Sequence, residues 1–277
     1  MLHLHVKLLT MPYLKALVSI AAVVDELIFW HWLGGPNIER PPVPQGAGGL
    51  RCLWGHSALY GYNVSVPATS PRPLLRGWLH VVGAVALAGA SPLLFARAHT
   101  WSQVGWILCF VVGVEAMFVT SALFHRIRWT QSHRRAFKRA DHSAIFLAIT
   151  GSYLAIAGLT MHGTIRLVLL LVVIAGAVVG VGIRQWALDA PKWVNTLPYL
   201  VVGWAAVAVL PQIYRGGGTE CFVLIVGGGL AYTLGALAYA FKRPPLSPRV
   251  FGYHELFHAG TLVGAGLNFW AIAVALH

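Results

Sequence analysis

The chain has 277 residues, of which 57% are hydrophobic and only 10% are charged. Soluble domains carry about 25% charged residues because their surface faces water, so most of the surface of this chain must face lipid. The formal net charge of +12 would favour nucleic-acid binding in a polar protein. In a chain this apolar, basic residues are instead expected in cytoplasmic loops, where they meet anionic lipid head groups. Composition therefore predicts an integral membrane protein whose partners are membrane lipids and not nucleic acids.

The N-terminal part differs from the rest of the chain. Residues 12–33 are apolar but interrupted by two acidic residues, and a Pro/Gly-rich stretch follows at 36–49. The apolar stretch could be an interfacial helix, an eighth span or a region without function. We therefore treat 1–70 as an N-terminal extension, in which 12–33 could form an extra apolar helix before a Pro/Gly-rich linker, and 71–277 as the membrane domain.

Seven apolar stretches follow, each close to the ~20 residues needed to cross about 30 Å of hydrocarbon. They lie near 77–96, 102–124, 141–161, 165–185, 194–213, 220–241 and 253–275. The connections are short, so successive spans should be antiparallel neighbours. Alternating strand-like segments are missing from the sequence, which argues against an outer-membrane barrel. The predicted fold class is an all-α polytopic membrane protein with a seven-transmembrane-helix bundle.

The distribution of basic residues predicts the orientation of these spans. Thirteen Lys and Arg fall on one side of the predicted membrane domain and three on the other. The first side holds Arg72, Arg76, Arg126, Arg128, Arg134, Arg135, Lys138, Arg139, Arg184, Lys192, Lys242, Arg243 and Arg249, and the second holds Arg97, Arg166 and Arg215. By the positive-inside rule, we expect a plasma-membrane protein with the N-terminal side of the bundle in the cytoplasm and the C-terminus outside.

The last span begins with the string His254-Glu255-Leu256-Phe257-His258. Two histidines four residues apart share one face of a helix, so both imidazoles can reach one metal ion. The string also matches the HExxH pattern of zinc peptidases, in which the glutamate is the base. A zinc peptidase needs a further ligand downstream, and no Asp, Glu or Cys follows His258. A protease is therefore the weaker interpretation, and two interfacial histidines without a metal are the alternative.

Other polar residues fall at the same end of the predicted bundle. Ser121 and His125 end the second span, and Asp141 begins the third. Both positions lie on the side where the last span begins, so these residues can converge with His254 and His258; at the opposite end they would be about 30 Å away. Three imidazoles with an open fourth position are typical of a catalytic zinc site. The sequence predicts an intramembrane Zn²⁺ bound by His125, His254 and His258.

The remaining polar residues suggest roles around that metal. Asp141 would hold a water at the zinc or take its proton, and Ser121 would orient a ligand or the carboxylate. The alternative for Asp141 is that it only caps the third span or pairs with Arg139. Two further residues are candidates to contact the ligand side chains without binding the metal. They are His80, one turn inside the first span on the same side, and Glu255.

Several strings in this region occur in a fixed order across residues 70–277. They are Arg76-Gly77-Trp78-Leu79-His80, Ser121-Ala122-Leu123-Phe124-His125-Arg126, Asp141-His142-Ser143-Ala144-Ile145-Phe146, Gly151-Ser152-Tyr153, Asp189-Ala190-Pro191-Lys192-Trp193 and Phe251-Gly252-Tyr253-His254-Glu255-Leu256-Phe257-His258. In these strings the chain resembles the hemolysin III family, the bacterial branch of the progestin and adipoQ receptor superfamily. The resemblance implies seven helices, a cytoplasmic N-terminal side and an intramembrane zinc ion.

The pattern of three histidines, a serine and an aspartate also resembles that of alkaline ceramidases, which hydrolyse lipid amides. We therefore expect a zinc-dependent hydrolase of a lipid amide or ester. One alternative is a membrane-active cytolysin, as the family name implies, although the spans lack the polar faces that line a pore. Another is a receptor or sensor with structural zinc, as the superfamily name implies, and an HExxH metalloprotease comes last.

Overall fold

A computed structural model of the chain describes residues 73–186, 189–244, 247 and 249–276. The chain divides into two units, Met1–Pro71 and Arg72–His277, and the described residues all belong to the second. The predicted N-terminal extension at 1–70, with its apolar helix and linker, lies outside the described residues.

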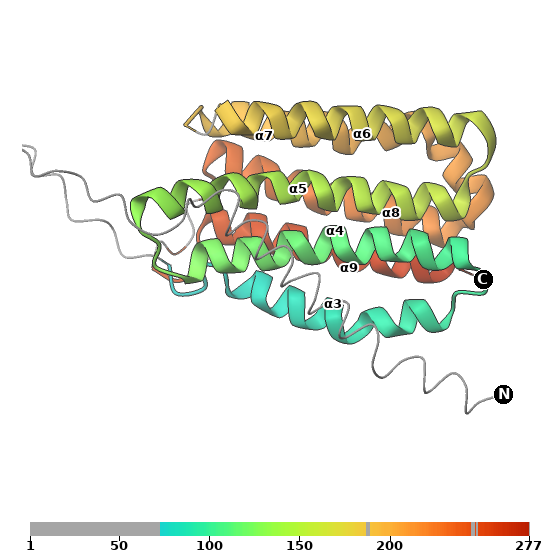
Figure 1. Cartoon of the computed structure of the whole chain (residues 1–277), viewed down its shortest axis with the longest axis horizontal. Helices are drawn as coiled ribbons and strands as arrows, with labels where there is room; N and C mark the ends of the chain where they lie inside the picture. Colours follow the sequence, from blue (N-terminus) through green and yellow to red (C-terminus); the bar gives the residue numbers. More distant parts are fainter. Residues whose placement is uncertain (1–72, 187–188, 245–246, 248, 277) are drawn as a thin grey trace, which may run out of the picture. The chain divides into compact units, whose positions relative to one another are not determined.

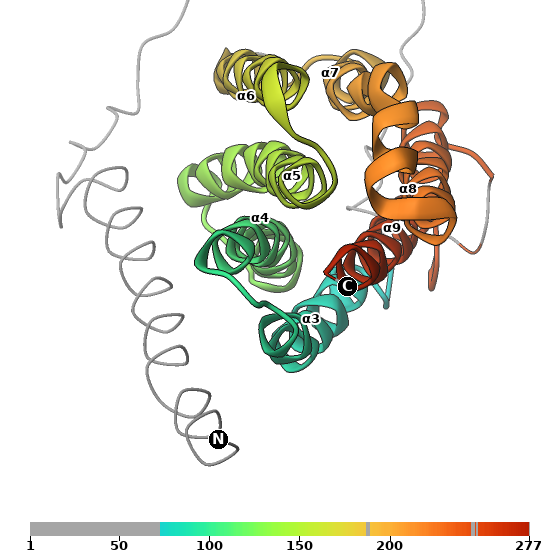
Figure 2. The ribbon, with the colours of Figure 1, turned by 90° about the vertical axis from the view of Figure 1, so that its right-hand side faces the viewer.

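The described part of the second unit is helical. Its elements are α3 (Trp78–Ala96), α4 (Trp101–Arg126), α5 (Gln131–Thr160), α6 (Gly163–Trp186), α7 (Lys192–Gly203), the 3₁₀-helix η1 (Trp204–Val209), α8 (Leu210–Phe241) and α9 (Tyr253–Ala275). Seen end-on in Figure 2, α3 to α9 follow one another around a common axis. Contacts between α3 and α9 close this arrangement.

Within these residues, six helical segments are long and apolar enough to cross a membrane. They are Trp78–Ala96, Trp101–Arg126, Gln131–Thr160, Gly163–Trp186, Lys192–Phe241 and Tyr253–Ala275. The protein is therefore an all-helical, multi-pass membrane protein. The spans predicted at 194–213 and 220–241 both fall within one helical stretch of 50 residues, Lys192–Phe241.

This long stretch is not one straight helix. Fifty residues of continuous α-helix would measure about 75 Å, more than twice the thickness of the hydrocarbon core. Gly218 interrupts it with a left-handed backbone (φ 75°, ψ −178°), a conformation that glycine adopts at low cost. Just before the break, Gly216 packs so closely on the end of α5 that a Cβ atom would lie 1.8 Å from the Thr160 carbonyl oxygen.

After Gly218 the helix returns along α9. The Trp270 indole, near the end of α9, donates a hydrogen bond to the Glu220 carboxylate (3.1 Å). The Tyr239 ring, near the end of α8, lies 5.2 Å from the ring of His254 at the start of α9. The stretch therefore passes from one end of the bundle to the other and back, as Figure 1 shows for α7 and α8.

Small residues allow α4 and α5 to approach closely. A Cβ on Gly113 would lie 2.5 Å from the Leu147 carbonyl oxygen, and one on Gly151 would lie 2.3 Å from the Cys109 carbonyl oxygen. Because lipid is as apolar as the side chains, such close backbone packing is a main source of stability between membrane helices. These contacts set the distance between the two helices that carry Ser121, His125 and Asp141.

The start of α5 differs from the prediction. The third span is predicted to begin at Asp141, but the helix begins ten residues earlier, at Gln131. Its 30 residues extend about 45 Å, so its first turns continue beyond about 30 Å of hydrocarbon. Hydropathy marks only the part of a helix that lipid surrounds, and the earlier turns are basic. Asp141 is therefore an interior residue of α5 and does not cap it.

Candidate metal centre

Three histidines from two helices meet at one end of the bundle. His125 comes from the last turn of α4, and His254 and His258 come from the first two turns of α9. One ring nitrogen of each lies within 4.8 Å of the other two, and the Nε2 atoms of His254 and His125 are 3.2 Å apart. Two imidazoles on a tetrahedral zinc, with Zn–N bonds of about 2.0–2.1 Å, hold their nitrogens about 3.3 Å apart. One pair of nitrogens already has this spacing, and the three side chains form a candidate metal site.

A small cavity of about 30 Å³ lies against this cluster. Ser121, Asp141, His254 and His258 are among its lining residues. This volume exceeds the roughly 10–15 Å³ that a cavity needs to hold one water molecule. In the part of the chain that the structure describes, the Nδ1 atoms of His80 and His258 are buried without a hydrogen-bond partner. The hydrogen-bonding capacity of this cluster is thus not met by protein groups alone, which suits a site for an ion and its water.

Asp141 and Ser121 lie beside the histidines. Asp141 is only 8% exposed, and its Oδ2 is 4.0 Å from Nε2 of His125. The Ser121 hydroxyl donates a hydrogen bond to this carboxyl group. A separation of 4.0 Å is too long for a direct hydrogen bond but leaves room for an atom or a water between the two groups. The carboxylate is therefore placed to accept a proton at the edge of the cluster.

His80 packs against His258, one of the three histidines. Its ring stacks on that of His258, with centroids 3.9 Å apart and planes 11° apart. The Thr261 hydroxyl donates to the His258 carbonyl oxygen (2.8 Å), so its own oxygen accepts from Nε2 of His80, also at 2.8 Å. This network assigns the proton of His80 to Nε2. His80 and Thr261 together hold the His258 ring in place.

Glu255 lies elsewhere, although it neighbours His254 in the sequence. It is fully buried, pairs with Nε of Arg76 and accepts a hydrogen bond from the Gly252 N–H (2.8 Å). It caps α9 and ties that helix to the segment before α3. The structure does not bring it to the cavity with the three histidines, so a protease mechanism with Glu255 as the base has no support in this geometry.

The sequence interpretation missed several residues around the cavity. Arg184, counted as a loop residue, is fully buried and donates hydrogen bonds to the side chain and the carbonyl oxygen (2.8 Å) of Asn195. Its guanidinium lies 5.5 Å from the ring centroid of Tyr199, which lines the small cavity together with Tyr239. Polar residues inside apolar spans were the available signal for Arg184 and Asn195. Nothing in the local sequence marks the two tyrosines.

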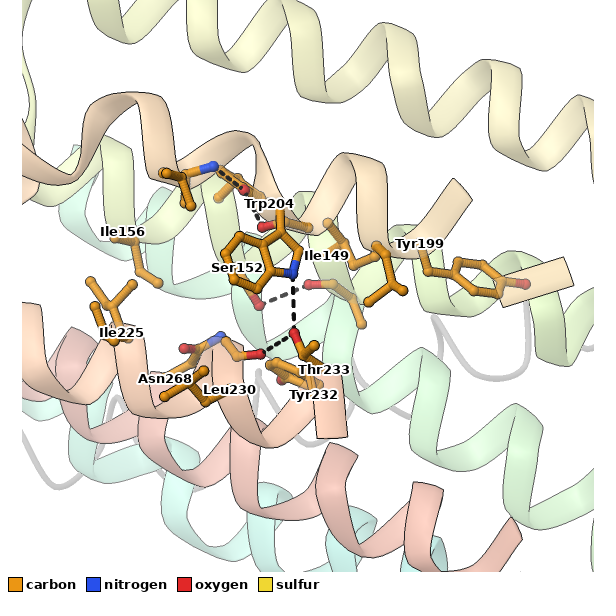
Figure 3. A pocket seen from close by; sticks show the side chains of 18 of the residues that line it. Ile149, Ser152, Ile156, Tyr199, Trp204, Ile225, Leu230, Tyr232, Thr233 and Asn268 are labelled. Carbon is orange, nitrogen blue, oxygen red and sulfur yellow. Dashed lines mark hydrogen bonds between the residues drawn. The ribbon is translucent and has the colours of Figure 1, made fainter. Parts of the chain in front are cut away.

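A larger cavity of about 230 Å³, shown in Figure 3, lies next to the small one. Its lining comes mainly from α5, α7, η1, α8 and α9, with Met117 of α4 and Leu169 of α6, and is mostly aliphatic and aromatic. The indole of Trp204 donates a hydrogen bond to the Thr233 hydroxyl (3.1 Å). The two cavities share the lining residues Met117, Ile145, Tyr199, Phe257 and Thr261. The larger, apolar cavity therefore lies next to the cavity that His254 and His258 line.

Known proteins resemble this chain over the same region. The family model described as haemolysin-III related matches residues 68–269. "Hemolysin-3" of Bacillus cereus is 25% identical over 196 residues, which cover 70% of this chain and 86% of that protein. "Hemolysin-3 homolog" of Bacillus subtilis (strain 168) is 26% identical over 182 residues, covering 65% and 82%. "Monocyte to macrophage differentiation factor" of Homo sapiens is 25% identical over 195 residues, covering 68% and 76%.

Proposed function

The chain belongs to the haemolysin-III related family, and we propose that it hydrolyses a lipid amide or ester at a zinc ion bound by His125, His254 and His258. The observation that carries this proposal is the junction of the two cavities. The small cavity, which His254, His258 and Asp141 line, shares five lining residues with an apolar cavity large enough to hold part of an acyl chain. A lipid bound there would present its polar linkage to the cluster.

The proposal includes a topology. We infer seven passes, because the stretch Lys192–Phe241 turns back at Gly218. The end that carries the histidine cluster would face the cytoplasm of a plasma-membrane protein, with the C-terminus outside, because most Lys and Arg lie at that end. The basic first turns of α5 would then contact the anionic head groups of the inner leaflet.

The chemistry divides between the metal and the protein. Zinc in such a site supplies a Lewis acid and makes water nucleophilic near neutral pH. The Asp141 carboxylate takes a proton from the attacking water, and the Ser121 hydrogen bond holds that carboxylate in place. The water oxygen bonds to the carbonyl carbon, the C–N or C–O bond breaks, and Asp141 returns the proton to the leaving nitrogen or oxygen. The products are a fatty acid and an amine or alcohol.

The decisive experiment measures zinc and hydrolysis in the same detergent-purified samples. Wild-type protein should hold one zinc ion per chain and release fatty acid from a panel of lipid amides and esters. Alanine at any one of the three histidines should lower zinc content sharply, because two remaining imidazoles make a poor tetrahedral site. His162→Ala, at an exposed histidine after α5, is the matched control and should retain both zinc and hydrolysis. Wild-type protein without zinc, or a triple variant that retains it, would exclude the site.

Two other functions remain as outcomes of the same experiment. Full zinc occupancy without hydrolysis of any lipid in the panel would favour a receptor or sensor with structural zinc. The relatives named "Hemolysin-3" suggest a cytolysin, which purified protein would reveal by releasing dye from lipid vesicles. Leakage that persists in a variant without the three histidines would separate this activity from the zinc site.

A further inference from the structure

Lys192 is held beside the histidine cluster by two tyrosines. Its ammonium group donates a hydrogen bond to the Tyr253 hydroxyl (2.6 Å) and lies 4.1 Å and 4.4 Å from the ring centroids of Tyr253 and Tyr239. The Tyr239 ring in turn packs against His254, with ring centroids 5.2 Å apart. Lys192 of α7 is therefore held against α8 and α9 by a tyrosine that also contacts His254.

The positive charges around the cluster exceed the negative ones. Glu255 neutralises Arg76, and Asp141 is the one carboxylate of the described residues that lines the small cavity. Neither Lys192 nor the buried Arg184 has a carboxylate within 4.0 Å in the described part of the chain. A buried charge is costly without a partner of opposite sign, which applies to Arg184, whereas Lys192 is half-buried at the start of α7. This end of the site is thus suited to a ligand that brings negative charge.

Two helices, α7 and α9, place the larger cavity, the cluster and Lys192 in the same order. On α7, the larger cavity begins at Tyr199, Thr196 lines the small cavity, and Lys192 lies one turn further toward the end of the bundle. On α9, the larger cavity reaches Phe257, His254 belongs to the cluster, and Tyr253 holds Lys192. A lipid with its acyl chain in the larger cavity and its amide at the cluster therefore directs its head group toward Lys192.

We propose that the substrate is a lipid amide with an anionic head group, such as an N-acyl amino acid, and that Lys192 binds the carboxylate of that head group. This inference rests on the proposed hydrolase function. Water adds to the acyl carbonyl carbon, the C–N bond breaks, and the nitrogen gains one proton of the water, so the products are a fatty acid and the free amino acid. A neutral lipid amide of equal chain length lacks the group that Lys192 recognises.

Two probes with the same acyl chain and amide test the inference by binding alone. N-oleoylglycine is anionic and N-oleoylethanolamide is neutral, and the affinity of each is measured by thermal shift of zinc-loaded protein in detergent. A charge-assisted hydrogen bond predicts that wild-type protein prefers the anionic probe about tenfold or more. The preference should fall to near unity in Lys192→Met and persist in Lys192→Arg. Wild-type protein with equal affinity for the two probes overturns the inference without any variant.

A matched lysine at the same end separates this contact from general surface charge. Lys138→Met also removes one positive charge there, but Lys138 pairs with Asp189 on the exposed surface (3.2 Å). It should leave the preference unchanged, and an equal loss in both variants contradicts a specific role for Lys192. Hydrolysis of both probes at equal rates, unaffected by Lys192→Met, would refute the head-group inference and leave the hydrolase standing. A binding preference that depends on Lys192, without hydrolysis of either probe, would support the head-group contact and refute the hydrolase.

Discussion

Replacing Asp141 by asparagine separates proton transfer from metal binding. Asparagine has nearly the same shape and can still accept the hydrogen bond from Ser121, but it cannot take a proton from water. Because α5 begins at Gln131, Asp141 does not act as a helix cap, so the change does not disturb the start of the helix. The three histidines are untouched.

The expected effects on the two quantities differ in size. Loss of a general base usually lowers the rate by ~10²-fold or more, which corresponds to about 2.7 kcal/mol of activation free energy. The Asp141 carboxyl oxygen lies 4.0 Å from Nε2 of His125, so it neighbours a proposed zinc ligand. Mutation of a residue that contacts a metal ligand typically lowers metal affinity 10–100-fold. With zinc in excess, Asp141→Asn should therefore stay loaded while hydrolysis falls by about two orders of magnitude.

Zinc content and the release of fatty acid are measured on the same purified sample. Glu115→Gln is the matched control, because Glu115 is another carboxyl within a span but lies about 15 Å along α4 from His125. It should keep its activity within about twofold. Activity of Asp141→Asn close to wild type at equal zinc content would refute the role of this residue as a base. Complete loss of zinc would instead make Asp141 part of the metal site itself.

Three further predictions concern stability and topology. Gly151→Ala should lower the free energy of unfolding by about 1–3 kcal/mol, because its Cβ would collide with the backbone of α4. A Cβ on Gly105 would meet open space, so Gly105→Ala should not destabilise the protein in the same unfolding titration. Glu255→Gln should lower the thermal unfolding midpoint, because it removes the buried ion pair with Arg76. The variant should retain zinc, and loss of zinc would contradict the placement of Glu255 away from the histidine cluster. In a variant without the native cysteines, Ser132→Cys should react with a membrane-impermeant thiol reagent only after the cells are permeabilised, and labelling of intact cells would reverse the proposed orientation.

The comparison with known proteins confirms the resemblance to the hemolysin III family, which the strings around the histidines suggested. The membrane class was equally accessible from sequence, because the free energy of placing a residue in lipid depends mainly on that residue. Helix periodicity and the alternation of spans then placed His125, Asp141, His254 and His258 at one end of the bundle. The structure brings their side chains together, and the bound zinc stays a prediction.

Other features depend on contacts between distant residues, and only the tertiary structure decided them. Glu255 pairs with Arg76, 179 positions earlier, so its place in the HExxH string gave a misleading indication of its role. The sequence places Lys192 in a loop between two predicted spans, and only the structure shows Tyr239 and Tyr253 beside it. Hydropathy averages over about 20 residues and reports affinity for lipid. It contains no term for the packing of one helix on another, and that packing creates the apolar cavity, the pairing of buried charges and the turn that redirects α8 along α9.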